Sequence, residues 1–301
     1  MAFAHPVLFY RGAADYLAGT VPFIRSALAA GEPVAAVVPT AHLQLLRDEL
    51  GPDAGSVWLV DMSVAGRNPG NIIPGVMRAF ADKHDGPVRI VGESVWPGRT
   101  AVEYPACAQH EALVNYAFAG LDATILCPYD AENLTHDVLD DARRTHHTTE
   151  YEPDLVVEKY NQRLDVPADA LTLTTHAGFP PIRRSVADFA TRAGLERVDD
   201  MVLAVDELTA NSVRHGGGAG TVFLWSEPGS VVCQVEDHGH LTNQLAGRVP
   251  ASVTQFGGRG LLLVNHLADL VRIHTTPKGT AVRVYFKLPP TTPLPAAHTN
   301  S

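Results

Sequence analysis

The first half of the chain alternates between short apolar runs and longer amphipathic stretches. The apolar runs have the length of buried strands, at residues 7–10, 34–38, 57–60, 88–91 and 123–127. The stretches between and after them have helical spacing, at residues 13–30, 41–50, 72–84, 106–119 and 135–144. Because strands that alternate with helices form parallel sheets covered on both faces, residues 1–150 are predicted to be a parallel-sheet α/β domain.

The second half has a different pattern, with hairpin-like strands grouped beside helices. Strands are expected at 171–175, 221–225 and 231–235 and in a closing hairpin, and helices at 182–193, around Glu207 and after a glycine-rich loop. Mixed strands with helices on one face form an α+β sandwich. We therefore expect a second domain at 168–289.

Two stretches fall outside these domains. Residues 151–167 are charged and flanked by proline, which is typical of a linker or a bridging helix. Residues 290–301 are rich in proline and are predicted to be a disordered tail.

Composition narrows the function classes. The chain has 301 residues and a formal net charge of −10, which disfavours nucleic acid as a partner because phosphates would be repelled. No apolar stretch approaches the ~18 residues of a membrane span, and no signal peptide is seen, so a soluble cytoplasmic protein is expected. Cys107, Cys127 and Cys233 lie far apart and are expected to be reduced core residues. No pair of histidines or cysteines has metal-ligand spacing, so no metal cluster is expected.

The most informative motif is LAVDELTANSVRHGGG, in which Glu207 and Asn211 stand four residues apart. This spacing places both side chains on one helical face. An amide oxygen is a hard ligand for Mg²⁺, and a carboxylate can order or deprotonate a hydroxyl. His215 follows Asn211 by four residues and is expected at the rim of the same site. A solvated surface charge is the alternative for Glu207.

A second motif, FGGRGLLLV, places glycines before an apolar run with helical spacing. Gly257, Gly258 and Gly260 would feed a helix N-terminus, whose free amides and dipole attract anions. An ordinary glycine-rich turn before a core helix is the alternative. Between the two motifs stands EDHGH, in which Asp237 is either a site residue or a turn residue.

The order of ExxxN, DxG, GGxGL and GT resembles the Bergerat-type ATP-binding fold of the GHKL superfamily, most closely its anti-sigma-factor serine kinase branch. The resemblance covers residues 171–288. It implies that Asn211 holds Mg²⁺, that Glu207 is the general base, that Asp237 binds the adenine amino group, and that Thr280 supports the adenine end. The other residues that it places at the nucleotide are His215, Gly239, Gly258, Arg259, Gly260 and Leu261.

One residue departs from the family pattern. The acidic box of the family usually reads DxGxG, and this chain has His240 where the second glycine belongs. An imidazole at that position would either narrow the pocket or remove a backbone conformation with positive φ, which glycine adopts at little cost.

The first half contains the stretches VRIVGESVWPGRTAVEY, QHEALVNYAF and ILCPYD after an opening HPVLFYRGAADYLAG. Together they resemble the MEDS sensory domain, a module similar to RecA-like ATPase folds, over residues 5–148. No GxxxxGK motif followed by Ser or Thr occurs, so the resemblance implies sensing or docking of a small molecule and not a second ATPase. Candidate ligand residues are polar or aromatic groups at strand ends or within apolar helices: His5, Tyr10, Glu93, Trp96, Glu111 and Asn115. For each of them a structural role is the alternative.

Three functions fit the sequence. The first is a serine/threonine protein kinase that uses Mg-ATP to phosphorylate a STAS-type anti-sigma-factor antagonist, with a sigma factor as the alternate partner. The second is a partner switch that binds ATP without transferring phosphate, and the third is a small-molecule sensor with the nucleotide domain as a relay. The kinase branch also implies a homodimer. A histidine kinase is disfavoured because His136, His146 and His147 lie in a short polar stretch without heptads, as surface histidines would.

Overall fold

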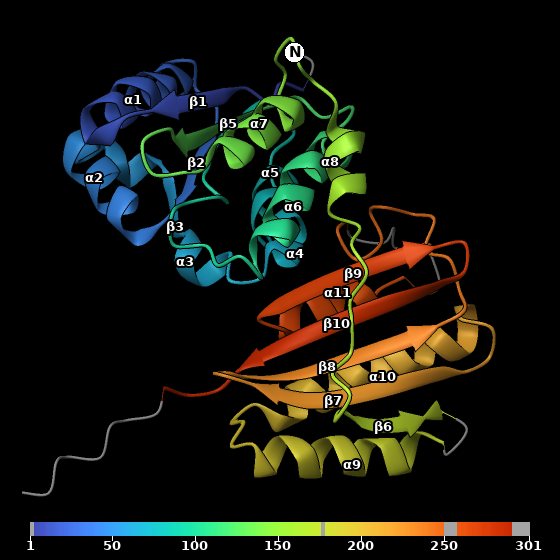
Figure 1. Ribbon diagram of the computed structural model, residues 1–301. Coiled ribbons are helices and arrows are strands. Elements are labelled where there is room, and N and C mark those ends of the chain that lie inside the picture. Colours follow the sequence, from blue (N-terminus) through green and yellow to red (C-terminus); the bar gives the residue numbers. More distant parts are fainter. Residues whose placement is uncertain (1–2, 176–177, 250–257, 291–301) are drawn as a thin grey trace, which may run out of the picture.

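The computed structural model describes residues 3–175, 178–249 and 258–290. Figure 1 shows an N-terminal α/β region beside a C-terminal region built on a second sheet. The predicted tail, from residue 291 onward, and Gly257 lie outside the described residues. The cysteines are free and buried, as predicted.

The N-terminal sheet is parallel, with strand order β1-β5-β4-β2-β3. Its strands are β1 (Val7–Tyr10), β2 (Val34–Val38), β3 (Trp58–Asp61), β4 (Val88–Gly92) and β5 (Ala123–Asp130). The helices around it are α1 (Gly12–Ala29), α2 (Thr40–Leu50), α3 (Met62–Ala65), α4 (Pro69–Ile72), α5 (Arg78–Ala81), α6 (Tyr104–Ala117) and α7 (His136–Thr145). The predicted parallel-sheet fold is confirmed.

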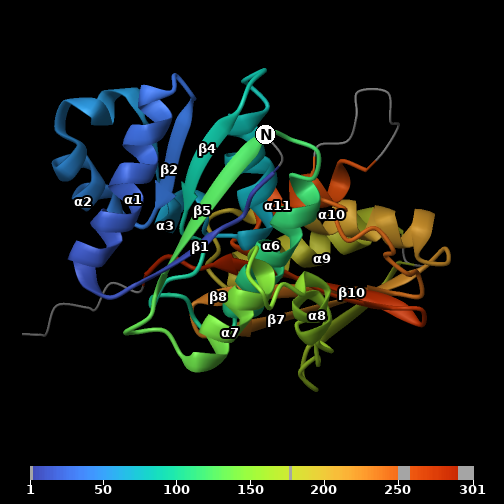
Figure 2. The same cartoon turned by 90° about the horizontal axis from the view of Figure 1, so that it is seen from above.

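Both faces of this sheet are covered, as its apolar strands require (Figure 2). Along β2, Val34, Ala36 and Val38 pack in the core beneath α1 and α2. The alternate residues Ala35 and Val37 pack in the core on the other face, which α4 to α7 complete. Period-two alternation explains why one continuous apolar run can supply both cores.

The helix expected at 72–84 is interrupted. Helix α4 runs into a π-helical turn (η2, Ile73–Met77) before α5 begins. Pro74 lies inside this turn and has no amide hydrogen to donate to the preceding turn. A local change of hydrogen-bond register accommodates it.

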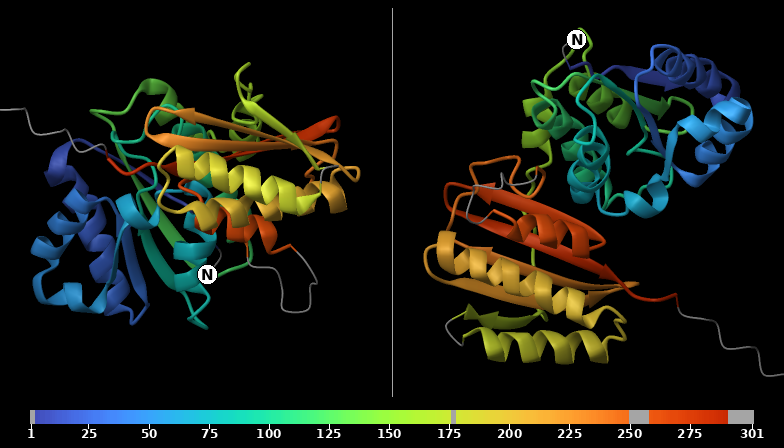
Figure 3. Two further views of the ribbon diagram at one scale, coloured as in Figure 1. Left: turned by 90° about the horizontal axis from the view of Figure 1, so that it is seen from below. Right: turned by 180° about the vertical axis from the view of Figure 1, so that it is seen from behind.

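The C-terminal sheet is antiparallel, with strand order β6-β7-β8-β10-β9. Its strands are β6 (Leu171–Thr174), β7 (Gly220–Glu227), β8 (Ser230–Asp237), β9 (Leu270–Thr276) and β10 (Gly279–Lys287). Figure 3 shows α9 (Phe179–Arg192), α10 (Val198–His215) and α11 (Gly260–Leu267) on one face of this sheet. Cys233 of β8 packs in the core under these helices, whereas its neighbour Val232 packs on the opposite face. The predicted sandwich is confirmed.

The two regions touch along the edge strand β9. Ala106 of α6 packs with Trp225, Val232, Leu270 and Tyr285 on the face of the C-terminal sheet that the helices leave open. The Arg272 guanidinium on β9 donates to the Val102 carbonyl at 3.2 Å, just before α6.

The segment predicted as a linker contacts both regions. It forms α8 (Pro153–Lys159), whose Val156 packs against Ala108 and Ala112 of α6. Farther along, the Asn161 side-chain amide donates to the Thr275 carbonyl at 2.8 Å, and the Leu164 carbonyl accepts a bond from Gln234. None of the helices in the described part of the chain combines the length and hydropathy needed to cross a membrane.

Candidate functional site

A pocket of about 320 Å³ opens between α10, the ends of β8 and β10, and the start of α11. Its apolar walls include Leu208, Val235 and Val282. It brings together most of the residues predicted for the nucleotide: Asn211, His215, Asp237, Gly239, Gly258, Gly260, Leu261 and Thr280. An apolar pocket with a few convergent polar groups is the usual form of a small-molecule site.

The Asp237 carboxylate is held at the end of β8. Its Oδ2 accepts a hydrogen bond from the Ser212 hydroxyl at 2.7 Å, and its Oδ1 accepts one from the Gly239 amide at 2.9 Å. Each oxygen keeps a further lone pair, so the carboxylate can still accept an amino group from a bound base. Sequence reasoning missed Ser212, because adjacent residues of a helix do not point the same way and its contact with Asp237 depends on the packing of α10 against β8.

Thr280 on β10 acts on the backbone of the loop after β8. Its hydroxyl donates to the Gly239 carbonyl at 2.8 Å and lies 2.8 Å from the Thr275 hydroxyl. Thr275 in turn accepts the Leu241 amide at 3.0 Å. Because the Thr280 proton goes to Gly239, Thr275 is the donor to Thr280. This chain fixes residues 239–241 against the sheet, and sequence reasoning missed Thr275.

At this end of the pocket, Gly216 and Gly239 lie too close to their neighbours to carry a side chain. A Cβ atom at Gly239 would lie 2.5 Å from the His215 carbonyl oxygen, and one at Gly216 would lie 2.4 Å from the Asp237 carboxyl carbon. Real Cβ contacts are not that short. The C-terminal end of α10 can therefore approach the DxG loop only because both positions lack side chains.

His240 lines the pocket and is exposed. Within the described part of the chain, every residue with positive φ is a glycine, so His240 has an ordinary backbone conformation. The imidazole therefore lies at the pocket wall without backbone strain, and the two effects considered for it, a narrower pocket and the loss of a positive-φ conformation, both stay predictions.

The other end of the pocket is formed where α11 begins. Gly258 has a φ of +81°, in the region that favours glycine. A Cβ at Gly260 would lie 2.7 Å from the Glu207 Oε2 atom and 3.2 Å from the Asn211 Nδ2 atom. The α10 pair therefore lies directly against the first turn of α11. Glu207 and Arg259 are not among the residues that line the pocket.

These residues fit a magnesium nucleotide. The Asn211 amide oxygen can be a Mg²⁺ ligand, and Glu207 lies one helical turn before it on the same face. The amides at the glycine-rich start of α11 suit phosphate oxygens. A flat base would fit between the apolar walls, with its amino group toward Asp237.

The ligand candidates of the N-terminal region fall into two separate groups and one isolated residue. In the first group the buried Glu93 accepts bonds from the Tyr10 hydroxyl at 3.2 Å and from His42 Nδ1 at 2.7 Å. Burial raises the pKa of Glu93. His42, whose ring stacks on Tyr16 at 4.0 Å, was not predicted. Trp96 lies apart, with the Arg99 guanidinium 3.9 Å from its ring centroid.

The second group joins three predicted residues, His5, Glu111 and Asn115, to two that were not predicted to be ligands. His5 Nδ1 lies 3.2 Å from Asn115 Oδ1, and His5 Nε2 lies 3.3 Å from Cys127 Sγ. His146 Nε2 lies 3.3 Å from Glu111 Oε2. The expectation that His146 is a surface residue is wrong, because its ring is buried beside the His5 ring, with centroids 4.1 Å apart.

Comparison with known proteins separates the same two regions. Residues 4–147 match the family model of the MEDS domain, the "MEthanogen/methylotroph, DcmR Sensory domain". Residues 174–286 match the model of the histidine kinase-like ATPase domain. Among curated proteins there is no significant match.

Two solved structures are distantly similar. The RsbU and RsbW domains of Rv1364c from Mycobacterium tuberculosis share 21% identity at a TM-score of 0.30, over 41% of this chain and 33% of that one. The histidine kinase AdeS from Acinetobacter baumannii shares 14% identity at a TM-score of 0.27, over 62% of this chain and 96% of that one. Both likenesses are too distant to support an argument about this protein.

Proposed function

Because this chain joins a MEDS domain to a histidine kinase-like ATPase domain, we propose that it is an ATP-dependent serine/threonine kinase of the anti-sigma-factor type. Its substrate would be a STAS-type antagonist protein, and a sigma factor would be its alternate partner. The observation that carries the proposal is the convergence of Asn211, Asp237, Thr280 and the Gly258–Gly260 loop on one pocket, from four separate motifs.

In this proposal each group has one task. Asp237 accepts the adenine amino group, and Thr280 keeps the loop at Asp237 in place through Gly239. Asn211 supplies an oxygen to the magnesium ion that accompanies the phosphates. Glu207 takes the proton from the substrate hydroxyl. The hydroxyl oxygen of the substrate bonds to the γ-phosphorus, and ADP leaves.

The MEDS domain is proposed to regulate this site through α11, which directly follows the phosphate loop. The buried Asn265 of α11 donates to the Gly247 carbonyl at 2.9 Å, at the pocket wall. The Asn68 amide, at the start of α4 in the MEDS domain, donates to the Asn265 carbonyl at 2.7 Å. A shift of α4 would therefore reach α11 and the pocket wall through two hydrogen bonds.

The first experiment measures nucleotide binding. Calorimetry with the full-length chain and Mg-ATP should give binding that Asn211→Ala and Asp237→Ala each weaken about tenfold to hundredfold, since each loses a polar partner worth roughly 1–3 kcal/mol. Circular dichroism of both variants checks that they fold. Affinity like that of the wild type in both would refute the site.

The second experiment measures phosphotransfer. The chain is incubated with γ-labelled ATP and with STAS-type proteins that co-purify with it from its native cell, and labelled serine or threonine is identified. Glu207→Gln should keep ATP binding and lower transfer by about 100- to 10,000-fold, the usual contribution of a positioned base.

The adjacent carboxylate offers a matched control. Asp206 pairs with Arg183 of α9 at 2.5 Å, so Asp206→Asn should leave transfer unchanged. ATP binding without any labelled protein would contradict the kinase and favour the non-catalytic partner switch.

A further inference from the structure

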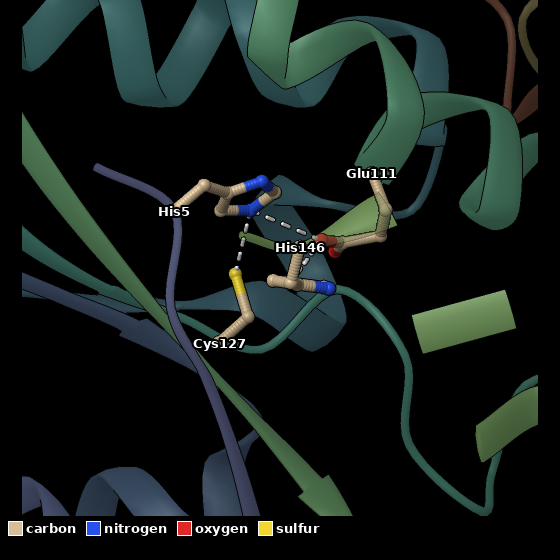
Figure 4. Close-up of side chains that lie close together, drawn as sticks. All are labelled: His5, Glu111, Cys127 and His146. Atoms are coloured by element: carbon tan, nitrogen blue, oxygen red, sulfur yellow. Dashed lines mark hydrogen bonds and ion pairs between the residues drawn. The ribbon is translucent and has the colours of Figure 1, made fainter. Parts of the chain in front are cut away.

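Four metal-ligating side chains meet inside the MEDS domain, away from the nucleotide pocket. His5 precedes β1, Glu111 lies on α6, Cys127 on β5 and His146 directly after α7. All four are buried, between 0% and 2% exposed. Their ligand atoms lie within 4.8 Å of one another. Figure 4 shows these four side chains gathered at one place.

Three of the distances in this cluster match those around a tetrahedral ion. Zinc bonds of about 2.0–2.3 Å place neighbouring ligand atoms roughly 3.3–3.8 Å apart. His5 Nε2 lies 3.3 Å from Cys127 Sγ and 3.6 Å from Glu111 Oε2. Glu111 Oε2 lies 3.3 Å from His146 Nε2. The three separations fall within the range for such a tetrahedron.

Hydrogen bonds outside the cluster aim the lone pairs of both imidazoles inward. The Asn115 amide nitrogen donates to carbonyls, among them that of Thr145 at 2.8 Å, so its oxygen faces His5 Nδ1 and accepts the proton there. His146 Nδ1 donates to the Ala142 carbonyl at 2.7 Å. Both imidazoles therefore turn their Nε2 atoms toward the cluster, as in metal sites whose histidines are oriented by carbonyl or carboxylate partners.

Glu111 is oriented in the same way. Its Oε1 accepts the Ser94 hydroxyl, which turns Oε2 toward His146. In the described structure neither Glu111 Oε2 nor His146 Nε2 has a hydrogen-bond partner, and both are fully buried. Two buried acceptors that face each other at 3.3 Å require something positive between them, a proton or a cation.

We propose that His5, Glu111, Cys127 and His146 bind a divalent transition-metal ion, with Zn²⁺ as the ion that two imidazoles, a thiolate and a carboxylate suit best. The site is closed, since all four positions are filled by protein and buried. A closed four-ligand site is typical of structural zinc. The ion would join the start of β1 and the adjoining part of β5 to α6 and α7.

The test uses the full-length chain and Zn²⁺ alone. After chelator treatment, one Zn²⁺ per chain should bind with a Kd below about 1 μM, as expected of a structural zinc site. Co²⁺ in place of Zn²⁺ should give a thiolate charge-transfer band and the intense visible bands of a four-coordinate site. Zinc should raise the unfolding midpoint of the MEDS domain.

The chain supplies a matched pair of cysteines for the control. Cys127→Ser should weaken Zn²⁺ binding by at least about 100-fold and remove the Co²⁺–thiolate band, because losing a ligand costs at least as much as losing one of its outer partners. Cys107 is as deeply buried but lies outside the cluster, so Cys107→Ser should leave both unchanged. Glu111→Gln should also weaken binding while keeping the shape of the side chain.

The alternative to a metal is a shared proton, and the same measurements separate the two. A folded wild-type chain that binds no Zn²⁺ or Co²⁺ in this range would overturn the site in favour of a proton. Equal Zn²⁺ affinity in the Cys127→Ser and Cys107→Ser variants would overturn it as well. Both measurements are made without nucleotide, so they test the metal site and leave the proposed kinase activity to its own experiments.

Discussion

The Gly239→Ala variant tests the geometry of the pocket with a single methyl group. The new Cβ would lie 2.5 Å from the His215 carbonyl oxygen, 3.0 Å from Gly216 Cα and 3.1 Å from Asp237 Oδ1. Two of these neighbours are backbone atoms and the third is held by the Ser212 hydroxyl and the Gly239 amide, so the loop itself must move.

The cost follows from the bonds that such a movement breaks. Displacing residue 239 strains the Thr280 hydrogen bond to its carbonyl and the Asp237 bond to its amide, each worth about 0.5–1.5 kcal/mol. Overpacking adds about 1–3 kcal/mol. We expect the C-terminal domain to lose roughly 2–6 kcal/mol and ATP affinity to fall by at least about tenfold.

The assays are urea unfolding and calorimetry with Mg-ATP on the full-length chain. Gly86→Ala is the control, because a Cβ there meets nothing within 4 Å and its φ is ordinary. The control should match the wild type in both assays. Gly239→Ala with wild-type stability and affinity would refute the close approach of α10 to the DxG loop.

Two further variants probe the MEDS domain and its contact with the ATPase domain. Asn68→Ala should destabilise the full chain by roughly 2–5 kcal/mol in urea and alter ATP affinity, because the Gly70 and Val271 amides and the Asn265 carbonyl lose a buried partner; unchanged values would show that α4 and α11 do not depend on each other. Glu93→Gln should remove part of the fall in stability that the wild type shows as the pH rises above 4.5, the ordinary pKa of a glutamate. Burial raises the pKa of Glu93, so the folded state keeps its proton to higher pH and loses stability as pH rises through that pKa; equal slopes in the variant and the wild type would contradict this.

The spacing of apolar residues predicted most helices and strands correctly, because that spacing reflects which side chains are buried. The apolar runs at 7–10 and 34–38 coincide with β1 and β2. Strand β2 is buried along its whole length, so no polar position makes its ends uncertain. The helix predicted at 72–84 corresponds to a helical segment that runs from Pro69 to Ala81. Its π-helical turn was not predicted, because Pro74 changes the hydrogen-bond register without changing the apolar pattern.

Contacts between distant segments could not be predicted from spacing. Glu207 and Asn211 are one helical turn apart, so helix geometry alone places them together. By contrast, His146 was expected at the surface because its sequence neighbours are polar, and no pair of residues in the metal cluster has ligand spacing. Each of its four ligands comes from a different element, and only the β1–β5 pairing and the packing of α6 and α7 bring them together.

Helix α6 connects the two sites of this protein by geometry. Glu111 of the metal cluster and Ala106 of the apolar contact with the ATPase domain lie on the same helix. The Val102 carbonyl just before α6 accepts Arg272 of β9, and β9 pairs with β10, which carries Thr280 of the pocket. Because α6 is rigid, a displacement of its Glu111 end would also displace the end that contacts the C-terminal sheet. If the ion favours one position of α6 and ATP favours the same one, each must tighten the binding of the other by the same factor, since coupling between two binding equilibria is reciprocal.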